Sequence, residues 1–184
     1  NLMVSNSIPI RDLDLTAPLM HKKITVFHNR GASGIDGIIS TALGIAKASK
    51  SKTYLLIGDL AFYYDINSLL ITQKNSIPLI IILINNNGGR IFETLPISKH
   101  KNIFEKYFVT PHNLNFSEFV NAFGGNYFDV KSWANFKRIL KQAAAANNFS
   151  VLEIKTDSKK SLATRRKYFN KVISNYNSKR RDQR

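Results

Sequence analysis

The stretch IPLIIILINNNGGRIF, Ile77 to Phe92, changes character at its middle. An apolar run, Ile77 to Ile84, is followed by three asparagines and two glycines. Apolar runs without alternation are typical of parallel strands that are covered on both faces. A simple turn after such a strand needs one or two turn-forming residues. The polar segment Asn85 to Gly89 is longer than that, which favours a site at the end of this strand.

Strand and helix patterns alternate along the whole chain. Apolar runs predict strands, here Ile24 to His28, Thr53 to Ile57, Leu79 to Ile84, Tyr127 to Val130 and Val151 to Thr156. Helical spacing predicts helices, here Gly34 to Ser49, Asp65 to Lys74, Phe116 to Phe123 and Trp133 to Ala146. This order predicts an α/β fold, a doubly wound and mostly parallel sheet with helices on both faces. Pro96 to His112 has no clear period and is predicted to be a loop or lid.

Length and composition narrow the class of protein. The 184 residues suffice for one domain with a real core. The chain has no cysteine, which excludes disulfides, thiolate metal sites and a cysteine nucleophile. No apolar run approaches the roughly 20 residues of a membrane span, so we expect no membrane partner. Because Asn1 is not an initiator methionine, we expect a fragment or one domain of a longer protein.

Residue usage also bears on origin and charge. Heavy use of Lys, Asn, Ile, Phe and Tyr indicates an AT-rich genome, hence a plastid (chloroplast stroma) or otherwise a bacterial cytoplasm. The net charge of +15 is concentrated in Lys155 to Arg184, which holds eleven Lys or Arg against two Asp. No nucleic-acid motif accompanies this basic segment, so we favour a solvated helix over nucleic-acid binding. Its apolar residues recur at helical spacing like a packing face, namely Tyr168, Phe169, Val172, Ile173 and Tyr176. We therefore divide the chain into a ligand-binding domain, 1–156, and a basic C-terminal helix or tail, 157–184.

Three polar or glycine-rich loops follow the first three predicted strands. They are HNRGASGIDG (His28 to Gly37), GDL (Gly58 to Leu60) and NNNGG (Asn85 to Gly89). Ligands of open α/β sheets bind outside the carboxyl ends of the strands, so these loops are predicted to meet. The first loop places three glycines ahead of a helix, which suits a phosphate: Gly31, Gly34 and Gly37.

The second and third loops supply oxygen ligands. Asp59 offers a carboxylate, Asn86 a side-chain amide oxygen and Gly88 a backbone carbonyl. Mg²⁺ prefers such oxygen ligands, shared with substrate phosphates. Taken alone, Asn85 to Gly89 is better explained as an elaborate turn. The GD pair after the preceding strand and the glycine loop before it favour the metal site. The sequence has neither the HExxH spacing of zinc proteases nor the GxSxG elbow of hydrolases.

These residues resemble the thiamine diphosphate and Mg²⁺ motif of thiamine-dependent enzymes. Gly58-Asp59 is followed by Asn85-Asn86, with Leu60 where most of those enzymes have glycine. Longer segments are similar to 2-succinyl-5-enolpyruvyl-6-hydroxy-3-cyclohexene-1-carboxylate synthases of menaquinone and phylloquinone synthesis. They are NSIPIRDLD (Asn6 to Asp14), NRGASGIDG, GDLAFYYDIN, NNNGGRIFETLP and TPHNLNFSEFVNAFG (Thr110 to Gly124). The resemblance runs from about Asn6 to about Thr156.

The resemblance implies a transferase that uses thiamine diphosphate with Mg²⁺, or alternatively Mn²⁺. Its substrates would be 2-oxoglutarate, which loses carbon dioxide, and isochorismate, to which the remainder is added. The implied cofactor-binding residues are Ile35, Gly58, Asp59, Leu60, Asn86 and Gly88. The implied metal ligands are Asp59, Asn86 and the Gly88 carbonyl. The implied substrate-binding residues are Arg11, Arg30, Ile91, Phe92 and Leu95.

The resemblance covers only the diphosphate-binding, C-terminal part of these enzymes. They also need a glutamate from a pyrimidine-binding domain of a neighbouring subunit, which implies a missing domain or chain and a homodimer or higher oligomer. None of the glutamates in this chain lies in a segment resembling that domain: Glu93, Glu105, Glu118 and Glu153. We therefore expect no catalytic residue here and no activity from the isolated chain. Two alternatives stay open: another thiamine-dependent decarboxylase or acetohydroxyacid synthase, and a non-catalytic remnant with a basic binding tail.

Overall fold

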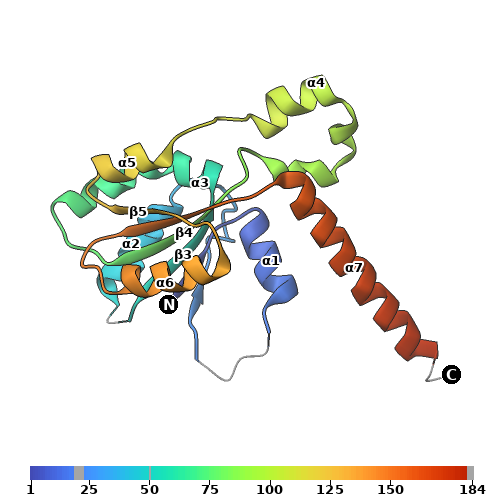
Figure 1. Cartoon of the computed structure of the whole chain (residues 1–184), viewed down its shortest axis with the longest axis horizontal. Coiled ribbons are helices and arrows are strands. Elements are labelled where there is room, and N and C mark those ends of the chain that lie inside the picture. Colours follow the sequence, from blue (N-terminus) through green and yellow to red (C-terminus); the bar gives the residue numbers. More distant parts are fainter. Residues whose placement is uncertain (19–22, 50, 182–184) are drawn as a thin grey trace.

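A parallel β-sheet with helices on both faces forms the centre of the molecule (Figure 1). The computed structural model describes residues 1–18, 23–49 and 51–181. The strands are β1 (Leu2–Val4), β2 (Val26–Phe27), β3 (Thr53–Gly58), β4 (Leu79–Asn85), β5 (Asn126–Asp129) and β6 (Ser150–Lys155). The α-helices are α1 (Ile8–Thr16), α2 (Ile38–Ala48), α3 (Asp59–Tyr64), α4 (Lys101–Phe104), α5 (Phe116–Ala122), α6 (Trp133–Ala144) and α7 (Ser158–Arg181). Tighter or wider helical turns are η1 (Ile66–Gln73), η2 (Arg90–Thr94), η3 (Pro96–Lys99) and η4 (Glu105–Val109).

The order of the strands confirms the predicted doubly wound fold. The sheet reads β2-β1-β3-β4-β6-β5, and every neighbouring pair is parallel. In the centre, Gly58 of β3 is in register with Ile84 of β4. Asn85 of β4 is in register with Lys155 of β6. The carboxyl ends of β3, β4 and β6 therefore lie at the same level, where the predicted site residues follow β3 and β4.

Strand β4 is apolar throughout because both faces of the sheet are covered. Leu79, Ile81 and Leu83 are fully buried in the larger core, to which α2, α3 and α5 also contribute. Ile80 points to the opposite face and packs in a smaller cluster with Ile139 of α6. Helix α6 begins as predicted, since the Ser132 side chain accepts a hydrogen bond from the Asn135 N–H at 3.1 Å.

Two elements near the N-terminus were not predicted. Strand β1 is only three residues long, yet it lies between β2 and β3. Helix α1 follows it directly, with Pro9 in its first turn. A three-residue strand has too few residues to show a hydrophobic period. Its place is fixed by pairing with two distant segments, because Leu2 is in register with Val26 of β2 and with Tyr54 of β3.

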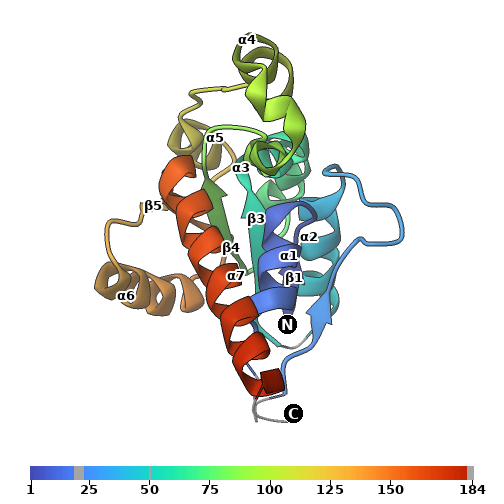
Figure 2. The same cartoon turned by 90° about the vertical axis from the view of Figure 1, so that its right-hand side faces the viewer.

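Three segments differ from their predictions. The helix expected from Gly34 begins only at Ile38. The helix expected from Asp65 to Lys74 is preceded by α3, which already begins at Asp59, and the segment after Asp65 is a 3-10 helix. The predicted loop Pro96 to His112 contains the helical turns η3, α4 and η4. We call residues 90–113 the arm; it projects beyond the sheet, with α4 at its far end (Figures 1 and 2).

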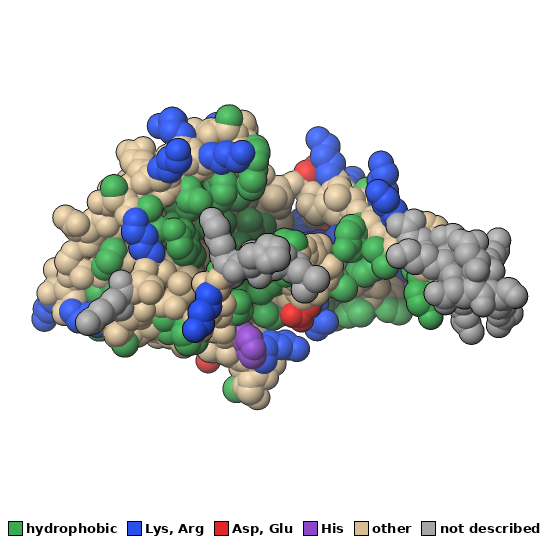
Figure 3. All heavy atoms as spheres, turned by 90° about the horizontal axis from the view of Figure 1, so that it is seen from below, with side chains coloured by type: hydrophobic (Ala, Val, Ile, Leu, Met, Phe, Trp, Pro, Cys, Tyr) green, Lys and Arg blue, Asp and Glu red, His purple; other side chains and the backbone are tan. Residues whose placement is uncertain are grey.

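The predicted basic tail, 157–184, is helix α7, and residues 182–184 lie outside the described part. Its first half runs beside α1 (Figure 2), where the Arg165 guanidinium bonds the Asp12 carboxylate and the Tyr168 hydroxyl donates to the Leu15 carbonyl. The predicted packing face is only half covered, because Phe169 is 39% and Tyr176 65% exposed. In Figure 3, Lys and Arg side chains are spread around the viewed face instead of forming one patch. None of the helices in the described ranges is both long and apolar enough to cross a membrane.

Candidate cofactor site at the carboxyl end of the sheet

A cavity of about 440 Å³ opens where β3 and β4 end. Its lining combines the ends of these strands with the start of α1 and with residues of the arm. Eight of the predicted site residues line it: Ile35, Gly58, Asp59, Leu60, Asn86, Gly88, Ile91 and Phe92. The structure thus brings together most residues that the sequence placed in separate loops.

The Asp59 carboxylate organises the loop after β4. Asp59 is the first residue of α3 and is 2% exposed. Its Oδ2 accepts hydrogen bonds from the backbone N–H groups of Gly88 at 2.9 Å and Asn86 at 3.2 Å. Its Oδ1 accepts one from the Leu60 N–H at 2.8 Å. These hydrogen bonds offset the burial of the carboxylate and fix the loop to the end of β3.

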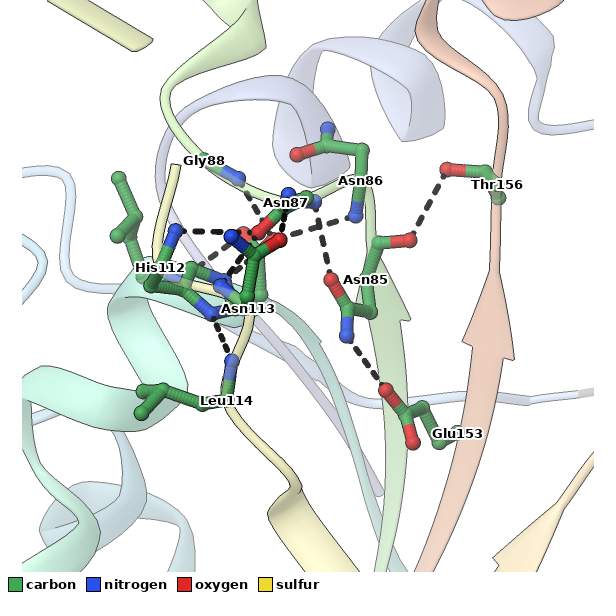
Figure 4. A network of polar contacts seen from close by, with 11 residues as sticks. Asn85, Asn86, Asn87, Gly88, His112, Asn113, Leu114, Glu153 and Thr156 are labelled. Atoms are coloured by element: carbon green, nitrogen blue, oxygen red, sulfur yellow. Dashed lines mark hydrogen bonds and ion pairs between the residues drawn. The ribbon is translucent and has the colours of Figure 1, made fainter. Parts of the chain in front are cut away.

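Two of the three asparagines hold the loop in shape (Figure 4). The Asn85 side chain accepts a hydrogen bond from the Asn87 N–H at 2.9 Å and donates to the Glu153 carboxylate at 2.5 Å. The Asn87 side-chain oxygen accepts from the backbone N–H groups of His112 at 3.1 Å and Asn113 at 2.9 Å. Asn85 therefore ties the loop to β6, and Asn87 ties it to the end of the arm.

Glu153 is shared between this loop and the edge of the sheet. It is 1% exposed, and besides Asn85 it accepts a hydrogen bond from the Tyr127 hydroxyl of β5. Burial and this hydrogen bond raise the pKa of the Tyr127 hydroxyl well above its ordinary value. Tyr127 is therefore a proton donor to Glu153 throughout the neutral range.

Asn86, the middle asparagine, has a different environment. Its side chain points away from the network that joins its two neighbours (Figure 4). The side-chain oxygen is buried and has no hydrogen-bond partner among the described residues, while Asn86 lines the cavity. A buried hydrogen-bond acceptor that has no partner lowers the stability of the folded state unless a ligand binds to it. This amide oxygen belongs to a cavity that the Asp59 carboxylate also lines, and the two groups fit a hard cation such as Mg²⁺.

Gly88 lets the loop pass close to the arm. Its φ is +127°, and a Cβ atom built on it would lie 2.1 Å from the Val109 carbonyl oxygen. The neighbouring Gly89 N–H donates to that same oxygen at 2.7 Å. The Gly88 carbonyl accepts the Arg90 N–H at 2.9 Å, which leaves one of its two lone pairs. Only glycine fits both the backbone conformation and the space.

The remaining predicted residues lie outside this cavity. Arg11 lines a smaller adjoining cavity of about 170 Å³, which shares Asn86 and Ile91 with the first. Arg30 is exposed, and neither it nor Leu95 is among the described residues that line these two cavities. From the glycine loop only Ile35 reaches the cavity, while the three glycines at 31, 34 and 37 do not line it.

Sequence reasoning missed three residues of the site. Asp12 and Arg165 line both cavities and bond each other through Nε at 2.9 Å and Nη2 at 2.5 Å. This hydrogen bond raises the pKa of the Arg165 guanidinium above its ordinary value. The third is His112, whose Nε2 lies 3.2 Å from Asp59 Oδ2. Each contact joins residues far apart in sequence, so spacing gave no signal for them.

The described part of the chain contains no group of three or more His, Cys, Asp or Glu side chains placed to hold a metal. The candidate ligands are instead one carboxylate, one amide oxygen and one carbonyl, which were predicted from the two loops. These are the donors of a cation site that a ligand's own phosphate oxygens complete. The arrangement of these donors in the cavity lining is thus suited to a diphosphate-bearing ligand.

Comparison with known proteins identifies the family. Residues 17–154 match the family described as thiamine pyrophosphate enzyme, C-terminal TPP binding domain. The chain belongs to this family. The match covers most of the sheet and both loops that bear the candidate ligands, so the resemblance inferred from the motifs is confirmed at the level of the family.

Individual relatives are more specific. The chain is 40% identical over 171 residues to the 2-succinyl-5-enolpyruvyl-6-hydroxy-3-cyclohexene-1-carboxylate synthase of Geobacillus kaustophilus, covering 93% of the chain and 30% of the relative. It is 43% identical over 158 residues to the synthase of that name from Desulfitobacterium hafniense, covering 86% of the chain and 28% of that relative. The chain thus spans under a third of the length of these relatives.

The fold also occurs in solved enzyme structures. The crystal structure of benzoylformate decarboxylase from Polynucleobacter necessarius superposes with a TM-score of 0.72 over 85% of this chain and 30% of that one. The sequence identity is 15%, so this likeness concerns the fold alone.

Proposed function

We propose that this chain is the diphosphate-binding part of a 2-succinyl-5-enolpyruvyl-6-hydroxy-3-cyclohexene-1-carboxylate synthase in menaquinone or phylloquinone biosynthesis. The observation that carries the proposal is the buried, unpartnered side-chain oxygen of Asn86, which together with Asp59 lines a cavity of about 440 Å³. The identity to relatives of that name supports the choice among thiamine enzymes.

The residues present fit thiamine diphosphate with a divalent cation. Asp59, Asn86 and the Gly88 carbonyl would hold Mg²⁺, or Mn²⁺ in its place, against the diphosphate. Ile35 supplies an apolar part of the cavity wall. When bound, thiamine diphosphate supplies the electron sink that decarboxylation of a 2-oxo acid requires. This chain contributes binding, orientation and an apolar wall.

The substrates would be 2-oxoglutarate and isochorismate, both of which carry carboxylates. Arg11 lines the adjoining cavity and offers a planar guanidinium for such a group. Ile91 and Phe92 form an apolar part of the wall of the larger cavity. Arg30 and Leu95, which are exposed here, would take part only together with another part of the complete enzyme. Its plastid or bacterial location is proposed from composition alone.

The half-site is tested by calorimetric titration of thiamine diphosphate into the chain, with and without Mg²⁺. We expect binding that requires the metal, and no detectable binding by Asp59→Asn, which lacks the anionic ligand. Asp14→Asn is the matched control, because it removes one exposed carboxylate on α1 without touching the cavity. Metal-independent binding, or equal binding by Asp59→Asn, would contradict the proposal.

The reaction itself is tested in a complete enzyme. The corresponding segment of the Geobacillus kaustophilus relative is replaced by this chain, which restores the pyrimidine-binding domain, its glutamate and the oligomer. We expect product from isochorismate and 2-oxoglutarate by the chimera, lost in its Asp59→Asn variant, and none from the isolated chain. Turnover of pyruvate but not isochorismate would favour another thiamine-dependent decarboxylase instead.

A further inference from the structure

His112 is a largely buried residue that the proposed site does not yet explain. It lies at the end of the arm, and its side chain is 10% exposed. Its ring is fixed on several sides. The ring packs edge-on against Phe116 with centroids 5.4 Å apart, and the backbone N–H is held by the Asn87 side-chain oxygen. Nε2 lies 3.2 Å from Asp59 Oδ2.

The hydrogen bonds assign the tautomer of the His112 ring. The Leu114 backbone N–H donates to Nδ1 at 3.0 Å, so Nδ1 is an acceptor and carries no proton. A neutral imidazole then bears its proton on Nε2. That Nε2–H donates to Asp59 Oδ2. A ring protonated on Nδ1 would face the Leu114 N–H with a second N–H donor, and a flipped ring would face it with a C–H group. This geometry therefore selects one tautomer and one orientation.

The two oxygens of Asp59 are consequently unequal. Oδ2 accepts three hydrogen bonds, from the N–H groups of Asn86 and Gly88 and from the His112 ring. Oδ1 accepts one, from the Leu60 N–H. A carboxylate oxygen has about two lone-pair sites, so Oδ2 is saturated and Oδ1 keeps one.

We propose that His112 is a positioning residue of the cation site: its Nε2–H holds Asp59 Oδ2 and leaves Oδ1 free as the ligand of a divalent cation. The proposal rests on the proposed function, because it takes Asp59 as a metal ligand. Hydrogen-bond partners of ligating groups fix their orientation, and their loss typically weakens metal affinity by about 10- to 100-fold. Since His112 ends the arm, the same contact ties the arm to the cation site.

Two substitutions separate the two hydrogen bonds of the ring. His112→Asn places an amide near the position of Nδ1, so its oxygen can accept the Leu114 N–H but nothing reaches Asp59. His112→Gln places an amide near the position of Nε2, so its N–H can donate to Asp59. A merely structural role for the ring would make both variants alike.

The test is calorimetric titration of Mg²⁺ into the 184-residue chain with thiamine diphosphate in excess. We expect Mg²⁺ affinity to fall by about 10- to 100-fold in His112→Asn and to recover to within about threefold in His112→Gln. Thermal unfolding of both variants checks that they are folded. The ¹⁵N NMR chemical shifts of the His112 ring in the wild type should show the tautomer protonated on Nε2. The His112 signals are assigned as those that disappear in His112→Gln.

Each outcome decides between the two proposals. Wild-type binding with an unchanged His112→Asn, or equal losses in both variants, overturns the positioning role and leaves the proposed function standing. An Nδ1-protonated ring overturns the positioning role without reference to any cofactor. Metal-independent binding, or no binding by the wild-type sequence in either the isolated chain or the chimera, overturns the proposed function and the positioning role with it.

Discussion

Replacing Gly88 by alanine tests the packing of the site loop against the arm. An added Cβ would lie 2.1 Å from the Val109 carbonyl oxygen and 3.1 Å from the Val109 carbonyl carbon. These are backbone atoms, which cannot rotate out of the way as a flexible side chain can. The φ of +127° adds strain for any residue with a Cβ. We therefore expect the loop and the end of the arm to separate.

The size of the effect follows from these two costs. A non-glycine residue in a sparsely populated backbone region costs about 1 to 3 kcal/mol, and overpacking adds about 1 to 3 kcal/mol. Together they lower the free energy of unfolding by about 2 to 6 kcal/mol. For a chain of this size, about 1 kcal/mol corresponds to roughly 2 to 4 °C in Tm, so we expect a decrease of at least about 4 °C.

The assay is thermal and urea unfolding followed by circular dichroism. Gly44→Ala is the matched control, because Gly44 lies in helix α2 and nothing stands within 4 Å of its added Cβ. That substitution should stabilise the chain by about 0.5 to 1 kcal/mol, since alanine is the better helix former. Equal Tm values for Gly88→Ala and the wild type would refute the close approach of Gly88 to Val109.

Two further predictions concern the hydrogen bonds that surround the site. The first concerns Tyr127, whose pKa is raised by burial and by Glu153, so the folded state favours its protonated form. That stabilisation is fully present below the unfolded pKa of about 10 and is lost as pH rises above it. The advantage of wild type over Tyr127→Phe in urea unfolding should therefore shrink between about pH 9 and 11, and a constant difference would contradict the raised pKa. The second concerns the Asp12–Arg165 pair, whose side chains are 43% and 32% exposed. A double-mutant cycle with Asp12→Ala and Arg165→Ala should give a coupling free energy of only about 0.2 to 1 kcal/mol. A much larger value would mean that α7 is held chiefly by this pair.

The sequence determined the fold class and the chemical nature of the site. Uninterrupted apolar runs such as Ile77 to Ile84 predicted buried parallel strands, and the alternation with helices predicted the doubly wound sheet. Parallel strands end at one edge, so Asp59, Asn86 and Gly88 could be expected to meet there. Eight of the predicted site residues do line one cavity. Local patterns sufficed for these predictions because each strand, and the residue types that follow it, can be recognised within a short segment of sequence.

Only the tertiary structure decided which contacts complete the site. β1 is three residues long, and its place between β2 and β3 depends on pairing with distant strands. His112 reaches Asp59 across 53 positions, and Arg165 reaches Asp12 across 153. The three asparagines are alike in sequence, yet of these only Asn86 keeps a buried, unpartnered oxygen. The Asn85 oxygen accepts the Asn87 N–H of the same loop, and the Asn87 oxygen accepts backbone N–H groups of the arm. Such roles depend on which chain segments pack together in space, and spacing along the sequence carries no record of that.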